Sequence, residues 1–304
     1  MKVFLLSLVP PALWAASNHF DKYIVSKYFK TIGVGAMMIF SALIGLLVLP
    51  VAALFQSNAF SISPVTALLM ALNGCLYLVA VQPYLKALKI SDASAAVPIF
   101  QIIPVISFFL ARVVLNETLT NNQIVGGLII VLGAIVVSFE IQESRKLKLR
   151  GDVLGLMFLS SLIFAANFLL FKVFAIDTDF WTTAFWESVG FIVFGVALLL
   201  FAKSYRTDFI SVFKRNGKVV VGLNVINEVL NIVAKLVFNY TSLLAALTLA
   251  WIAVGFQPVF VLIYSILLAV FFPKISKENV AGKHLVQKLI SIAVMLLGAY
   301  ILNS

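Results

Sequence analysis

The amino-acid sequence predicts an all-α membrane protein with ten transmembrane helices, arranged as two inverted five-helix repeats. Three observations lead to this fold class. Of the 304 residues, 62% are hydrophobic and 11% are charged, whereas a soluble domain has about 25% charged residues. The apolar residues form uncharged blocks, and a helix needs roughly 20 such residues to cross a bilayer. Short sequence matches also relate the two halves of the chain.

Ten apolar blocks supply the predicted helices. Lipid offers no hydrogen-bond partners, so the backbone that crosses it must form helices. The first block begins like a secretory signal peptide, but its match to a later block favours a transmembrane helix. We expect helices near residues 3–28, 31–55, 65–88, 93–115, 123–140, 151–174, 180–202, 219–241, 243–272 and 286–302.

The charged residues give the expected topology. The formal net charge is +10, and most of the 22 lysines and arginines fall in the loops after the odd-numbered helices. Such loops stay in the cytoplasm, which places both termini outside. Because the basic residues lie between apolar blocks, a nucleic-acid-binding face is not expected. We therefore expect a multi-pass protein of the cell inner or plasma membrane.

Cofactor and metal sites are not expected. The one cysteine, Cys75, excludes an internal disulfide, and the sequence has no cluster of cysteines and histidines of the kind that binds zinc. It also has no GxxxxGK[ST] loop for nucleotide phosphates. ATP hydrolysis is therefore not expected, and an ion gradient or exchange would drive any transport.

An internal repeat divides the chain into residues 1–150 and 151–304. A shift of 154 residues places Asn73 on Asn227 and Pro104 on Pro258. Five helices are an odd number, so the second copy enters the membrane from the opposite side. Inverted repeats of this kind are typical of secondary transporters, and chance matching among apolar helices is the alternative.

The predicted eighth helix carries the clearest polar signal. An ionisable group in a spanning helix costs several kcal/mol unless it faces a cavity or a partner. Spacings of three and four residues place the polar side chains on one face, so we predict a substrate cavity, with a hydrogen-bonded seam between helices as the alternative. The face comprises Asn224, Asn227, Glu228, Asn231, Lys235 and Asn239.

Other predicted helices contribute further candidates. Trp14, Asn18 and Asp21 share one face of the first helix. Prolines interrupt the fourth and ninth helices, and interrupted helices often surround a transporter site. An asparagine in a helix can also clamp two helices. The predicted substrate-binding residues are Asn18, Asn73, Tyr77, Gln101, Asn167, Asn227, Glu228, Asn231, Lys235 and Trp251.

Two acids in predicted helices are candidates for coupling to protons. An apolar environment favours the neutral form of a carboxyl group, so we expect Glu187 or Glu228 to exchange a proton during transport. The alternative is a static ion pair with Lys235 or Lys172. Glu117 is at a helix end, where we expect a loop or capping residue.

The most specific stretch for a family resemblance is residues 77–137. It contains Tyr84-Leu85, Ala87-Leu88, Ala93–Ala96, Pro98, Pro104, Asn116–Thr120, Gly126, Gly127 and Gly133. The sequence resembles the ten-helix EamA-type branch of the drug/metabolite transporter superfamily. The second copy departs from it, because Phe271 occupies the position of Glu117. The resemblance covers nearly the whole chain.

These features predict a transporter and not an enzyme. Acids, a base and amides suit an amino acid-like metabolite, and the resemblance implies export of amino acids or metabolites. Nucleotide sugars, sugar phosphates and carrier lipids are alternative substrates. An intramembrane enzyme acting on lipid phosphates and a non-transporting scaffold are alternative functions. We expect a small-molecule substrate, the bilayer and possible proton coupling as partners, in a monomer or homodimer.

Overall fold

All regular secondary structure in the described residues is helical. The computed structural model describes residues 2–28, 35–56, 59–90, 97–138, 151–271 and 282–304, which confirms the all-α fold class. The helices are α1 (Lys2–Leu6), α2 (Val9–Tyr28), α3 (Gly35–Leu43), α4 (Gly45–Phe55), α5 (Pro64–Ile90), the 3-10 helix η1 (Val97–Ile102), α7 (Ile103–Val114), α8 (Asn121–Ser138), α9 (Gly151–Asp177), α10 (Phe180–Phe201), α11 (Lys203–Leu244), α12 (Leu247–Val254), α13 (Gln257–Phe271) and α14 (Gly282–Asn303).

Seven stretches of the described residues are long and apolar enough to cross a membrane. They are Lys2–Asp21, Gly35–Phe55, Pro64–Ala87, Gly151–Asp177, Phe180–Phe201, Gly217–Leu244 and Leu247–Leu268. Shorter apolar helices cover Ile99–Val114, Asn121–Val136 and Leu289–Asn303. Each of these ten stretches lies mostly within one predicted block, while the number of membrane crossings stays a prediction.

Four predicted blocks are divided into two helices each. In the fourth block the 3-10 helix η1 gives way to α7, and in the ninth block α12 ends before α13 begins. Pro104 and Pro258 stand just after these breaks and cannot donate to the carbonyls of Phe100 and Val254. The division of the first two blocks, at residues 7–8 and 44, was not predicted.

Residues 203–218, which we predicted as a connecting loop, are helical and form the start of α11. Tyr205, Phe209 and Val212 lie three and four residues apart, so they share one helical face. That face packs on α3, where the ring centroids of Phe209 and Phe40 are 4.9 Å apart. The charged residues between these apolar positions concealed the amphipathic pattern.

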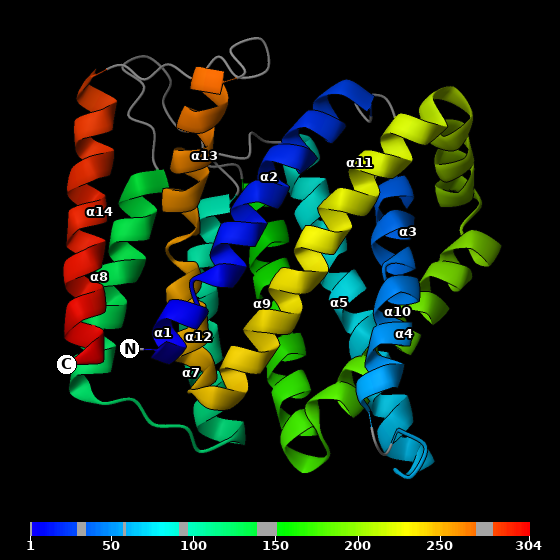
Figure 1. The fold of residues 1–304 in the computed structure, drawn as a ribbon, viewed down its shortest axis with the longest axis horizontal. Coiled ribbons are helices and arrows are strands. Elements are labelled where there is room, and N and C mark those ends of the chain that lie inside the picture. The colour runs from blue at the N-terminus through cyan, green and yellow to red at the C-terminus, as the bar shows by residue number, and fades with distance from the viewer. Residues whose placement is uncertain (1, 29–34, 57–58, 91–96, 139–150, 272–281) are drawn as a thin grey trace.

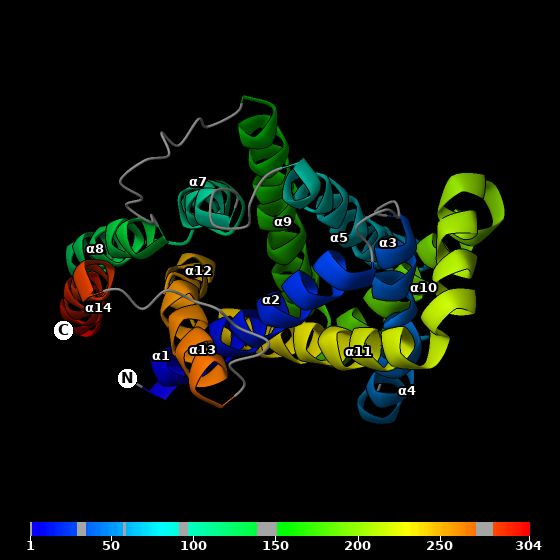
Figure 2. The ribbon, with the colours of Figure 1, turned by 90° about the horizontal axis from the view of Figure 1, so that it is seen from above.

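The helices pack in pairs around a central space. α2 packs against α11, and α9 packs against α5. α13 also contacts α2, and α7 contacts α9. Figure 1 shows α2 and α11 crossing the bundle side by side, with α8 and α14 together at its edge. Viewed from above in Figure 2, α2, α5, α7, α9, α11, α12 and α13 surround the middle of the molecule.

Two glycines bring α5 and α10 into close contact. A Cβ atom added at Gly190 would overlap the carbonyl group of Ala71, and one at Gly74 would overlap the carbonyl oxygen of Glu187. Small residues at helix interfaces allow the backbones to approach in this way. The contact also fixes the position of Glu187, which is important for the site described below.

We expect Gly190→Ala to lower the free energy of unfolding by about 1–3 kcal/mol, because the added methyl group forces two backbones apart. Gly155 of α9 is the matched control, since a Cβ atom there meets nothing within 4 Å. Melting temperatures of the purified variants in detergent would test this. A Gly190→Ala protein as stable as Gly155→Ala would contradict the expected packing.

Candidate functional site

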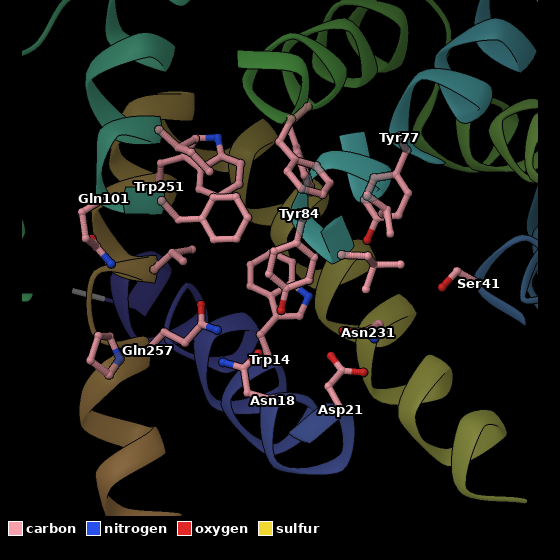
Figure 3. A pocket seen from close by; sticks show the side chains of 18 of the residues that line it. Trp14, Asn18, Asp21, Ser41, Tyr77, Tyr84, Gln101, Asn231, Trp251 and Gln257 are labelled. Carbon is pink, nitrogen blue, oxygen red and sulfur yellow. The ribbon is translucent and has the colours of Figure 1, made fainter. Parts of the chain in front are cut away.

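A cavity of about 160 Å³ lies between the helices that surround the middle of the molecule. Residues from both predicted repeats line it, and Figure 3 shows how their side chains converge. The polar lining residues are Asn18, Asp21, Ser41, Tyr77, Tyr84, Gln101, Glu228, Asn231 and Gln257. The aromatic lining residues without a hydroxyl group are Trp14, Phe100, Phe164, Phe168 and Trp251.

Both interrupted helices reach this cavity at their breaks. Phe100 and Pro104 line it from the first predicted repeat, and Val254 and Pro258 line it from the second predicted repeat. The two prolines are the residues that the 154-residue shift superposes. Interrupted helices at equivalent positions of two repeats are typical of substrate sites in secondary transporters.

Two carboxyl groups form an acidic end of the cavity. Asn227 Nδ2 donates to Asp21 Oδ1 at 2.8 Å, and Ser17 Oγ donates to Asn227 Oδ1 at 2.6 Å. Ser41 Oγ donates to Glu228 Oε1 at 2.5 Å. All these donors are neutral, and neither acid has an ion-pair partner among the residues that the structure describes.

Uncharged polar groups form the other end. Figure 3 shows Gln101 and Gln257 on the side of the cavity away from Asp21 and Ser41. Trp251 is 5% exposed, and its buried Nε1 has no hydrogen-bond partner among the residues that the structure describes. Gln101 is 8% exposed. An unpaired N–H group at this depth is costly unless a ligand or water accepts its hydrogen bond.

Four aromatic rings pack on one another beside the cavity. We call this group, Trp14, Phe168, Phe238 and Trp251, the aromatic floor. The rings of Trp14 and Trp251 stack with centroids 6.4 Å apart and planes 14° apart. Phe168 meets Trp251 edge-on at 5.1 Å, and Phe238 lies 4.7 Å from Phe168. The same buried cluster includes Leu247 and Ala250 of α12.

A second charged pair is buried next to the cavity. Lys235 Nζ donates to Glu187 Oε2 at 2.7 Å, and Asn73 Nδ2 and Asn167 Nδ2 donate to Glu187 Oε1 at 3.2 and 3.3 Å. The two asparagines also donate to each other's backbone carbonyls. The network therefore joins α5, α9, α10 and α11. Nζ further lies 5.1, 5.0, 5.2 and 5.9 Å from the ring centroids of Tyr77, Phe168, Phe171 and Phe191.

Glu117 and Lys172 form another pair, beyond the aromatic floor. Lys172 Nζ donates to Glu117 Oε1 at 2.5 Å and to the Ala245 carbonyl at 2.8 Å. Glu117 Oε2 accepts the Leu247 N–H at 2.9 Å, at the start of α12. Asn116, with φ 53, turns the chain after α7 and brings Glu117 to this position. A shallow second hollow surrounds the pair.

The structure divides the predicted substrate residues into two groups. Six of them line the cavity: Asn18, Tyr77, Gln101, Glu228, Asn231 and Trp251. Four lie in the adjoining hydrogen-bonded networks instead: Asn73, Asn167, Asn227 and Lys235. Of the two predicted proton-coupling acids, Glu228 lines the cavity and Glu187 forms the ion pair with Lys235.

Four polar lining residues, Asp21, Ser41, Tyr84 and Gln257, are not among the predicted substrate-binding residues. Asp21 shares a helical face with Asn18, and this signal was available in the sequence. Ser41 is a single small polar residue in an apolar helix, and nothing in its sequence surroundings distinguishes it. Its importance follows only from the position of Glu228 on another helix.

Comparisons with known proteins relate the chain to a transporter family. Residues 1–139 match the model of the EamA-like transporter family. No curated protein matches the chain. A solved structure described as "Crystal structure of protein" is 14% identical, covers 100% of this chain and 98% of its own, and has a TM-score of 0.61. At this identity the likeness shows a shared fold alone.

Proposed function

Because this chain belongs to the EamA-like transporter family, within the drug/metabolite transporter superfamily, we propose that its central cavity carries a small, amino acid-like metabolite across the membrane by alternating access. The observation that carries this proposal is the cavity itself. It combines two acids, several amides and the unpaired Trp251 N–H group with the breaks of two interrupted helices. Export is the direction that the resemblance to metabolite exporters favours.

We further propose ten membrane crossings and an inverted repeat of residues 1–150 and 151–304. The helix pairings support this. If α2 corresponds to α9 and α11 to α5, then the contact of α2 with α11 is equivalent to the contact of α9 with α5. The contacts of α13 with α2 and of α7 with α9 are equivalent in the same way. Two such halves can rock around a site between them.

The charges around the cavity favour this substrate over the alternatives. Nucleotide sugars, sugar phosphates and carrier lipids all carry phosphate groups, which proteins bind with arginine or lysine. The described residues that line the cavity include two acids and no base. Proton coupling is assigned to Glu228, because Glu187 is held by Lys235 and two asparagines.

Counterflow in proteoliposomes tests the proposed function. Vesicles are loaded with unlabelled amino acids or amines, and the entry of a labelled one is followed against protein-free vesicles. Uphill entry that depends on the internal solute supports a carrier. Absence of counterflow with every amine-bearing solute, in a preparation of folded protein, would reject the proposal.

We expect Glu117→Gln to open a path to the cavity between α9, α12 and the loop after α7. The Glu117–Lys172 pair joins α9 to the loop after α7 and to the start of α12, and a charge-assisted hydrogen bond contributes about 1.5–3 kcal/mol. Its loss should raise the labelling rate of a cysteine at Ala250, in the aromatic floor, by roughly tenfold or more with a membrane-impermeant maleimide. Lys172→Gln should raise the labelling rate by a similar factor. The double variant should be labelled little faster than either single variant. Unchanged labelling in both single variants would show that the pair does not block this path.

A further inference from the structure

We propose that the transported solute is a cation: a protonated amine at the Asp21–Glu228 end of the cavity, joined to an uncharged hydrogen-bond acceptor at the Gln101–Trp251 end. This inference rests on the proposed function and narrows its substrate class. An amino acid in its zwitterionic form would then bind less well than a derivative whose carboxylate is masked.

The first support is the charge of the lining. Asp21 and Glu228 both line the cavity, and their described partners are the neutral groups of Asn227 and Ser41. Charged groups in a poorly solvated interior are stable only when paired or neutralised. A zwitterion brings no net charge to such a site, whereas a cation provides a charge partner for an ionised carboxyl group.

The second support is the position of the bases. Lys235, the nearest candidate to bind a carboxylate, is 1% exposed and is bonded to Glu187 at 2.7 Å. Lys172 is bonded to Glu117 beyond the aromatic floor. The described residues thus leave no basic side chain facing the cavity, so a substrate carboxylate would lack a cationic partner there.

The third support is the chemistry of the two ends. Trp251 Nε1 is buried and unpaired in the cavity wall, which indicates that a ligand acceptor completes the site. Gln101 and Gln257 lie on the same side. These are neutral donors that suit a carbonyl or hydroxyl oxygen. The stacked rings of Trp14 and Trp251 provide a flat apolar wall, and aromatic faces also attract cations.

A matched series of ligands tests the inference. Each of alanine, leucine and phenylalanine is used as the free amino acid, the amide and the N-acetylated amide, which at pH 6.5 are a zwitterion, a cation and a neutral molecule. Binding is measured as thermal stabilisation of the detergent-purified full chain, and transport is measured as counterflow. We expect at least one amide to bind about tenfold or more tightly than its two counterparts, which corresponds to 1.4 kcal/mol.

Variants assign the effect to the acidic end. Asp21→Asn and Glu228→Gln should each reduce the preference for the amide, whereas Asp177→Asn, an exposed acid at the end of α9, should leave it unchanged. Binding of the free amino acid or the acetylated amide that is as tight as binding of the amide, or tighter, would overturn the inference. Absence of binding by every compound of the three series would overturn it too. Binding of the amides without counterflow would instead reject the proposed transport and leave the charge preference standing.

Discussion

Glu228→Gln is expected to lower the initial rate of counterflow at least roughly tenfold while leaving the protein folded. The carboxyl group lines the cavity and accepts a hydrogen bond from Ser41. A glutamine has the same shape and can still accept that bond, but it removes the negative charge. A hydrogen bond to a charged group contributes about 1.5–3 kcal/mol, which corresponds to a loss of between tenfold and about 150-fold.

The pH profile separates a role in coupling from a structural role. Other titratable groups that line the cavity are Asp21, Tyr77 and Tyr84. If Glu228 must lose its proton before the cation binds, the wild-type rate should rise with pH as the carboxyl group ionises. Glu228→Gln should show a weaker rise, and Asp177→Asn should retain the wild-type profile. A Glu228→Gln protein with normal, pH-dependent transport would contradict the assignment.

Lys235→Met is expected to destabilise the protein by about 3–5 kcal/mol, because it leaves Glu187 buried without its charge partner. Lys235 and Glu187 are 1% and 4% exposed, and their bond is 2.7 Å long. Glu187 also receives both asparagine side chains of the network, so its disturbance should extend to α5 and α9. Thermal unfolding in detergent, followed by circular dichroism, measures the effect.

The double variant Glu187→Gln, Lys235→Met distinguishes a structural pair from a substrate-binding base. Replacing both charges removes the uncompensated carboxylate, so the double variant should recover much of the stability lost by Lys235→Met. It should also retain measurable counterflow, since neither residue lines the cavity. A stable double variant without any transport would show that Lys235 or Glu187 acts directly in transport.

Local sequence signals predicted much of the fold. Apolar block length located the helices, and Pro104 and Pro258 indicated the breaks that line the cavity. The start of α11 was missed because its charged residues resemble a loop, while Tyr205, Phe209 and Val212 obtain their packing partners from α3. Contacts with distant segments decide whether such a charged stretch is helical, and these contacts cannot be read from the sequence of the stretch alone.

The site was predicted in part for the same reason. Helical periodicity placed Glu228, Asn231 and Lys235 on one face of the predicted eighth helix. Only Glu228 and Asn231 reach the cavity, because Glu187 of α10 and Asn73 of α5 lie beside Lys235 and its neighbours. The alternative of a hydrogen-bonded seam therefore describes one part of that face, and the cavity describes the other.

Solute protection of a cysteine in the cavity tests the central claim most directly. The sequence has a single cysteine, so Cys75→Ser gives a cysteine-free background, and Val81→Cys places a thiol in the cavity wall. A membrane-impermeant maleimide is applied to proteoliposomes with and without the solute of highest counterflow. We predict that the solute slows labelling at Val81→Cys with the same concentration dependence as transport. Labelling that no transported solute slows would show that solutes do not pass through this cavity.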